Sequence, residues 1–140
     1  MSINKNHWKD QFVRLPNQSD FHEQVRTIFR TNSWFKHMSC YQEVPVIDLV
    51  PSYPYATHRF DWYIDELATV LELHGAQHYK PTAFGAMSYE QKQKAFAESV
   101  KRDTSKQLAA EENDYYYRVL SYKDIPRLTA DSLKALLLKR

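Results

Sequence analysis

Two short, mainly apolar stretches lie in the middle of the chain, and each carries ionisable side chains in its interior. Residues 59–65 read Arg-Phe-Asp-Trp-Tyr-Ile-Asp, and residues 69–74 read Thr-Val-Leu-Glu-Leu-His. Short runs of this kind, bounded by turn signals, are typical of β-strands. We therefore expect two strands joined by a short turn near residues 65–68, with polar groups sharing a face.

Helical patterns lie on both sides of this hairpin. Asp20 begins a predicted helix, with Glu23 three residues later as a capping box. The apolar positions of this helix recur at helical spacing, and they are Phe21, Val25, Ile28 and Phe29. Residues 89–112, rich in Gln, Lys, Ala and Glu, predict one long helix. Thr129 is expected to cap a last helix with leucines on one side.

The remaining segments complete an α/β order. Residues 41–50 look β-like but contain Pro45 and stop at Pro51, which favours an edge strand or an irregular one. Residues 115–122 predict a further strand, residues 1–18 an N-terminal arm, and residues 75–88 a loop. The order helix-strand-strand-strand-helix-strand-helix is typical of an α/β fold.

Composition narrows the class of protein. The 140 residues are 43% hydrophobic and predict a single domain, 1–140, with a real core. Only two glycines occur, so neither a phosphate-binding loop nor a dinucleotide fingerprint can be written. Cys40 is the sole cysteine, which excludes an internal disulfide and a cysteine-built zinc cage and favours a buried thiol. The sequence has no membrane span and no signal core, so we expect a cytoplasmic protein.

The hairpin places three ionisable groups together. Side chains alternate between the faces of a strand, so Asp61 shares a face with Tyr63, and Glu72 shares one with His74. A turn centred on residues 66–67 sets Asp61 directly opposite Glu72, with His74 as the diagonal neighbour. Two carboxylates that close repel each other unless a cation lies between them or one is protonated. Oxygen ligands favour a hard cation such as Mg²⁺, which can bind a phosphate and activate water.

The long helix adds a fourth group. At 100° per residue, Asp103 falls within one face together with Phe96, Val100, Gln107 and Ala110. A buried carboxylate needs a partner. That partner is either a lysine at the edge of the same face, Lys101 or Lys106, or it is His74 or a metal-bound water.

Structural explanations exist for each residue alone. An acid in a strand is usually solvated, and a single histidine is more often a hydrogen-bonded structural residue. His74 and His78 could also be a zinc pair, but no further ligand completes a tetrahedral site. The combination of groups on one hairpin and one helix favours a metal-and-proton site.

At these residues the chain resembles the restriction-endonuclease-like superfamily of metal-dependent nucleases, the PD-(D/E)xK group. The matching frame is Asp61 followed by Glu72-x-His74, with His74 where the usual lysine stands. It looks closest to the branch of very-short-patch-repair (Vsr) and phage homing endonucleases. The order Asp61, His74-Gly75, His78 and Arg102-Asp103 matches that branch, and the resemblance covers residues 58–122.

The chain also departs from that branch. The two histidines are one residue closer together, the structural zinc site is missing, and Glu72 keeps an acid that the repair enzymes lack. The branch takes a glutamate from its first helix. Glu23 is the candidate for it, although its capping-box position already explains Glu23, and Glu43 is the weaker substitute.

The resemblance implies a restriction-endonuclease-like core, a mixed central sheet flanked by helices, and a Mg²⁺-dependent (Mn²⁺ possible) DNA endonuclease. In that reading Asp61 and Glu72 hold the metal, and His74 is the general base or stabilises the transition-state phosphate. Asp103 orients His74 or binds a metal-bound water, while His78 and Lys106 contact phosphate. DNA is the expected partner, with a homodimer or a recognition partner supplying further contacts. Exposed aromatics of the arm and loop could enter a groove or stack on bases, or could instead pack in the core or on the surface. They are Trp8, Phe12, Tyr79 and Phe84. The alternative is a catalytically silent DNA-binding or partner-binding protein that keeps the fold.

Overall fold

The computed structural model describes residues 8–10, 19–75 and 88–139. Within them five strands form one sheet in the order β1-β2-β3-β4-β5. These strands are β1 (Lys9–Asp10), β2 (Cys40–Pro45), β3 (Arg59–Ile64), β4 (Thr69–His74) and β5 (Tyr116–Ser121). The first three pairings are antiparallel and the β4–β5 pairing is parallel, so the sheet is mixed.

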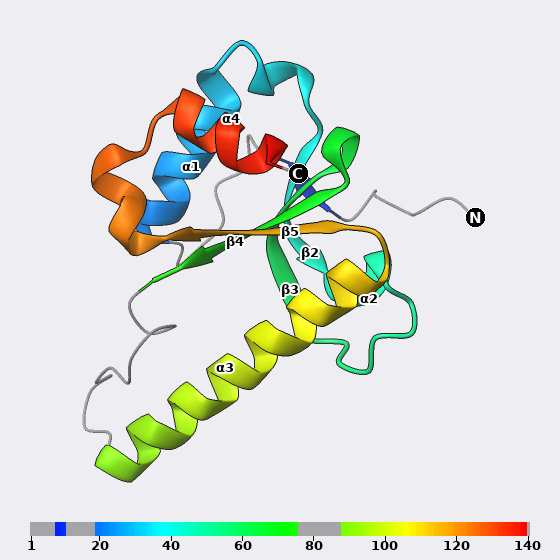
Figure 1. Ribbon diagram of the computed structural model, residues 1–140, viewed down its shortest axis with the longest axis vertical. Coiled ribbons are helices and arrows are strands. Elements are labelled where there is room, and N and C mark those ends of the chain that lie inside the picture. Colours follow the sequence, from blue (N-terminus) through cyan, green and yellow to red (C-terminus); the bar gives the residue numbers. More distant parts are fainter. Residues whose placement is uncertain (1–7, 11–18, 76–87, 140) are drawn as a thin grey trace.

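Helices cover both faces of the sheet (Figure 1). They are α1 (Asp20–Thr31), α2 (Val46–Leu49), α3 (Tyr89–Glu112) and α4 (Ala130–Leu138). Short 3-10 turns occupy Phe35–His37, Asp65–Leu67 and Tyr122–Arg127. The parallel β4–β5 pair is joined through α3, as a parallel connection requires. The α/β class predicted from the order of elements is confirmed.

Two hydrophobic cores lie against the sheet. One packs α1 and α4 on Trp62 and Leu71, with Phe29 and Leu133 completely buried. The other packs α2 and the C-terminal part of α3 on Tyr63 and Val70. All six residues of β4 are buried, because this strand has a neighbour on each side and a core on each face.

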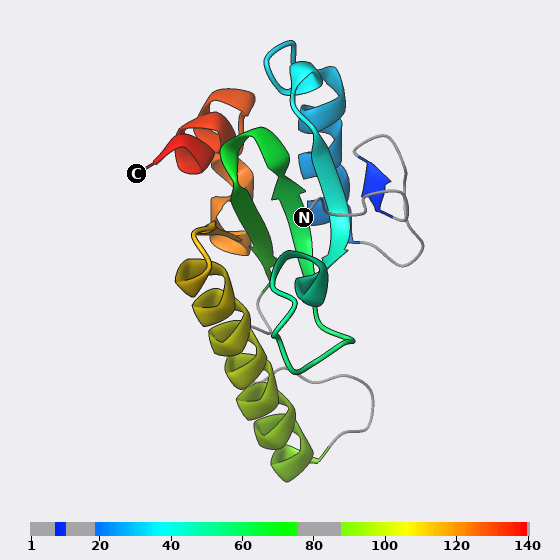
Figure 2. The same cartoon turned by 90° about the vertical axis from the view of Figure 1, so that its right-hand side faces the viewer.

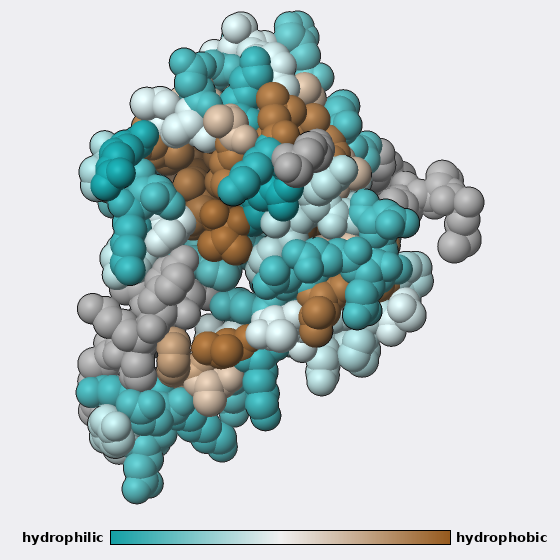
Figure 3. Space-filling model, in the orientation of Figure 1, coloured by the Kyte–Doolittle hydropathy of each residue, from teal (hydrophilic) through white to brown (hydrophobic). Residues whose placement is uncertain are grey.

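The long helix α3 extends well beyond the sheet (Figures 1 and 2). Its bounds match the predicted helix, and Ser88 with Gln91 forms a capping box at its start. In the view of Figure 3 its surface is mainly hydrophilic, and the exposed apolar residues of α3 include Val100 and Leu108. The buried residues of α3 are Lys106, Ala109 and Ala110. Gln107 is exposed, so the predicted face was partly wrong, because the packed face is centred nearer Lys106.

Three local predictions also need correction. Ser19, rather than Asp20, caps α1, since its side chain accepts from the backbone N–H of His22. The strand expected at the sheet edge lies between β1 and β3, and the chain turns into α2 directly after Pro45. Trp8 is buried against Tyr41 and donates through Nε1 to Asp48 at 2.8 Å, so it is not an exposed arm residue. Phe12, Tyr79 and Phe84 lie outside the described residues.

Candidate active site

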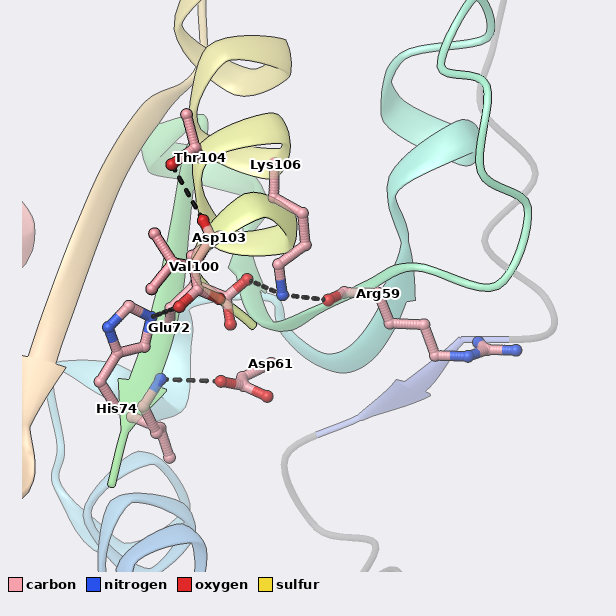
Figure 4. Close-up of polar contacts among 9 residues, drawn as sticks. Arg59, Asp61, Glu72, His74, Val100, Asp103, Thr104 and Lys106 are labelled. Carbon is pink, nitrogen blue, oxygen red and sulfur yellow. Dashed lines mark hydrogen bonds and ion pairs between the residues drawn. The ribbon is translucent and has the colours of Figure 1, made fainter. Parts of the chain in front are cut away.

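The β3–β4 hairpin has the predicted register. Trp62 pairs with Leu71 and Tyr63 with Val70, and continuing this register sets Asp61 opposite Glu72. Beyond the paired residues, a side chain continues the contact between the two strands: Asp61 Oδ2 accepts a hydrogen bond from the backbone N–H of Leu73 at 2.7 Å. Asp61 is therefore fixed against β4 by its own carboxylate, which leaves its charge beside Glu72 (Figure 4).

Glu72 and Lys106 form a buried ion pair. Lys106 Nζ lies 2.5 Å from Glu72 Oε1, and it also donates to the carbonyl of Arg59 at 2.8 Å. The two side chains are only 2% and 8% exposed. Burial raises the pKa of Glu72 well above its usual value, Asp61 raises this pKa further, and Lys106 opposes the rise. Lys106 thus comes from the α3 face that packs on the sheet and offsets part of the charge of the acids.

Glu43 is a third carboxylate in the same row. The β2–β3 register pairs Gln42 with Trp62 and Val44 with Phe60, which places Glu43 across from Asp61. Glu43 has a positive φ of 54°, a strained conformation for a residue other than glycine. Burial raises the pKa of Glu43, and Asp61 raises it further. The acids of three adjacent strands therefore form a single row.

The structure distinguishes the two glutamates considered for the first-helix role. Glu23 forms an ion pair with Arg26, whose other nitrogen donates to Gln42. Glu43 lines the same cavity as Asp61, whereas Glu23 lines a different hollow beside α1. Glu43 is the better placed of the two.

His74 and Asp103 lie side by side, which is one of the two pairings that the sequence left open for Asp103. The Nε2 of His74 lies 3.9 Å from Asp103 Oδ2, and the side chains are 10% and 18% exposed. The imidazole at the end of β4 points toward α3, where Asp103 is one turn before Lys106 (Figure 4). This pair adjoins the Glu72–Lys106 pair, so four of the proposed site residues gather between β4 and α3.

These groups surround an open cavity of about 560 Å³. Its lining combines acids and bases, and it consists of His22, Glu43, Thr57, His58, Arg59, Asp61, Glu72, Leu73, Arg102, Asp103 and Lys106. The cavity is therefore polar, with carboxylates and cations facing the same space. His74 is not part of this lining, but it lies beside Asp103, which is.

His22 is a site residue that the sequence did not indicate. It lies on α1, lines the cavity, and its Nδ1 is buried with no hydrogen-bond partner among the described residues. Burial lowers the pKa of His22, while nearby Asp61 raises it. In the sequence His22 is only the polar neighbour of a predicted capping residue, so no periodic signal marks it.

The two predicted phosphate contacts differ in outcome. Lys106 lines the cavity, but its ammonium is already engaged by Glu72 and by the carbonyl of Arg59. His78 lies outside the described residues. Arg59 and Arg102 are exposed cations of the lining that the sequence reading did not assign to phosphate.

The donor set suits a hard divalent cation. Within the described residues no three His, Cys, Asp or Glu side chains form a ready-made metal-binding group. Mg²⁺, however, is commonly held by one or two carboxylates together with water and substrate phosphate. Asp61 and Glu72 offer two carboxylates on adjacent strands, and burial, followed by the charge of Asp61, raises the pKa of Glu72. These residues therefore fit Mg²⁺.

In comparison with known proteins, no family model matches the chain and no curated protein matches it significantly. In the part of the chain that the structure describes, no helix has the length and apolar character needed to cross a membrane.

Proposed function

We propose that this protein is a Mg²⁺-dependent DNA endonuclease with a restriction-endonuclease-like core, related to the Vsr and homing branch. The observation that carries the proposal is the row of acids on adjacent strands, opposed by a buried lysine and beside a His–Asp pair. A mixed sheet with helices on both faces supports it. Mn²⁺ could replace Mg²⁺ at carboxylate ligands.

Each side chain has a distinct part in phosphodiester hydrolysis. Asp61 and Glu72 would hold Mg²⁺, which would polarise the phosphate and activate the attacking water. Lys106 favours the charged form of Glu72 that a metal ligand needs, since its ammonium lies beside one carboxylate oxygen and opposes the rise in the pKa of Glu72. The exposed guanidinium groups of Arg59 and Arg102 bind the flanking phosphates of the strand.

The His74–Asp103 pair either accepts a proton or stabilises the charge of the transition state. The Asp103 carboxylate lies 3.9 Å from His74 Nε2 and orients the imidazole ring. His74 thereby serves as the general base or as a stabiliser of the transition-state phosphate, and Asp103 positions it. In the net reaction water adds across one P–O bond, so the attacking oxygen loses a proton and the leaving oxygen gains one.

Plasmid nicking with Mg²⁺ tests this function through Asp61→Asn. The amide oxygen of asparagine can still accept from Leu73 N–H, so the variant keeps the hairpin contact and loses only the charge. We expect native protein to nick and Asp61→Asn to lose at least a hundredfold in rate. Glu112→Gln is the matched control, because Glu112 is exposed and lies outside the cavity.

Three outcomes separate the functions. Loss in Asp61→Asn with activity kept in Glu112→Gln supports the nuclease. DNA binding without any Mg²⁺- or Mn²⁺-dependent nicking indicates a silent DNA-binding module instead. Absence of both binding and nicking contradicts any action on DNA.

A further inference from the structure

A cluster of three aromatic rings stands at the rim of the cavity, in the segment between α2 and β3. Tyr55 stacks on His58 with ring centroids 4.7 Å apart and an interplanar angle of 25°. Tyr53 meets both rings at 5.6 Å. Tyr53 is buried, whereas Tyr55 is 51% exposed although it is a large aromatic residue. One ring is thus anchored in the core and another is presented to solvent.

The cluster is held rigidly. Tyr53 packs in the core, and its hydroxyl lies 2.7 Å from His58 Nδ1. Backbone bonds close the segment, with Tyr53 N–H donating to Val50 at 2.9 Å and Val46 N–H donating to the carbonyl of His58 at 3.0 Å. An aromatic ring fixed in this way loses little conformational freedom when a ligand binds on it.

The position of the cluster links it to the proposed active site. His58 lines the cavity together with Asp61 and Glu72. The segment runs alongside α3 (Figure 2), and burial, followed by the nearby charges of Arg102 and Lys106, lowers the pKa of His58. A flat, exposed ring therefore stands beside cations at the mouth of a cavity proposed to hold a phosphate.

We propose that the Tyr55–His58 stack is a platform for an unpaired nucleobase of a DNA strand whose phosphate lies in the cavity. The inference rests on the proposed function and narrows its substrate to DNA with an unpaired or single-stranded nucleotide near the cut. A base within a duplex already has neighbours on both faces, so only an unstacked base can use the exposed ring of Tyr55. Stacking on an aromatic ring accepts any base, and an adjacent guanidinium holds the backbone.

Binding without added metal tests the platform independently of cleavage. Three DNAs carry 2-aminopurine at one position: a perfect duplex, the same duplex with the fluorescent base as a one-nucleotide bulge, and the single strand. We expect the native chain to prefer the bulged and single-stranded DNAs over the duplex by roughly fivefold to 150-fold, the range given by one stacked base. The fluorescence of the bound base should be quenched.

Variants at Tyr55 identify the ring that stacks. Tyr55→Ala should remove both the preference and the quenching, and Tyr55→Phe should keep both. Tyr116→Ala is the matched control, since Tyr116 is 40% exposed on β5 and does not line this cavity. Circular dichroism of each variant confirms that the fold is kept.

The outcomes also separate this inference from the nuclease proposal. If Tyr55→Ala binds all three DNAs as the native chain does, the platform is wrong even where Mg²⁺-dependent nicking is seen. If the preference depends on Tyr55 but no nicking occurs, the platform stands and the nuclease proposal fails. A native chain without any preference for unpaired bases overturns the platform.

Discussion

Lys106→Met should show how strongly the buried ion pair affects stability. Lys106 Nζ is 2.5 Å from Glu72 Oε1, which corresponds to roughly 7 kcal/mol of Coulomb attraction at an effective dielectric constant of about 20. The cost of removing both charges from water offsets most of this gain. Methionine retains the apolar stem, so the substitution mainly removes the charge and the bond to the Arg59 carbonyl.

Lys106→Met should lower the free energy of unfolding, because Glu72 is left buried beside Asp61 without its partner. Removing one partner of a buried pair typically destabilises by about 3–5 kcal/mol. We expect a loss near the lower end of that range at pH 8, since protonation of Glu72 offers a partial escape. A domain of this size has about 5–15 kcal/mol of stability, so the variant should remain folded.

The pH dependence has a definite sign. The pKa of Glu72 is already raised in the folded state, and losing Lys106 raises it further. Between the unfolded pKa, near 4.5, and the higher folded pKa, the folded state binds more protons. Stability therefore falls as pH rises through that window, and the penalty for Lys106→Met should be smaller at pH 5 than at pH 8.

Urea unfolding of four proteins measures the effect: native, Lys106→Met, Glu72→Gln and the double variant. The double variant should be more stable than the sum of the single losses predicts, by at least about 1.5 kcal/mol, because it leaves no unpaired charge. Additive losses, or a Lys106→Met penalty of equal size at pH 5 and pH 8, would refute the assignment of this pair as a coupled buried unit.

Two further predictions follow from single side chains. Glu43→Gln should be more stable than the native chain at pH 8 and show no gain at pH 4, because the raised pKa of Glu43 makes its ionisation unfavourable in the folded state. Thermal melting at both pH values checks this prediction. An equal shift in melting temperature at both pH values would contradict it. Thr129→Ala should cost about 1 kcal/mol, since the Thr129 side chain accepts from Ser132 N–H at the start of α4; urea unfolding measures it, and Thr129→Ser, which keeps the hydroxyl, is its control.

The hairpin and the long helix were predictable because their signals are local. The turn at residues 65–68 fixes the register, so the opposition of Asp61 and Glu72 followed from sequence spacing alone. The bounds of α3 followed from its composition, which is rich in good helix formers. Asp103 was expected to pair either with Lys101 or Lys106 or with His74 or a metal-bound water, and in the structure it lies beside His74.

Other parts of the site depend on long-range packing that spacing does not encode. Glu43 joins the row only because β2 pairs with β3 across a connection that contains α2 and the aromatic segment. The rotation of α3 about its axis decides whether Lys106 or Gln107 is buried, and a helical wheel with so few large apolar residues cannot fix that angle. The burial of Trp8 depends on long-range packing in the same way, since its partner Asp48 is forty residues away.

A comparison of two buried charged networks supports the proposal that the row of acids is a functional site. The completely buried Arg26 is held by Glu23 on the same helix and by Gln42, so this network pairs its cation with an acid and an amide. In the other network Lys106 faces Glu72, which has Asp61 beside it, and burial and repulsion raise the pKa of Glu72. A fold that needed only stability would gain by replacing the second set with apolar residues of similar volume. The two adjacent carboxylates are unfavourable for the isolated chain, and under the proposed function a divalent cation bound between them would offset that cost.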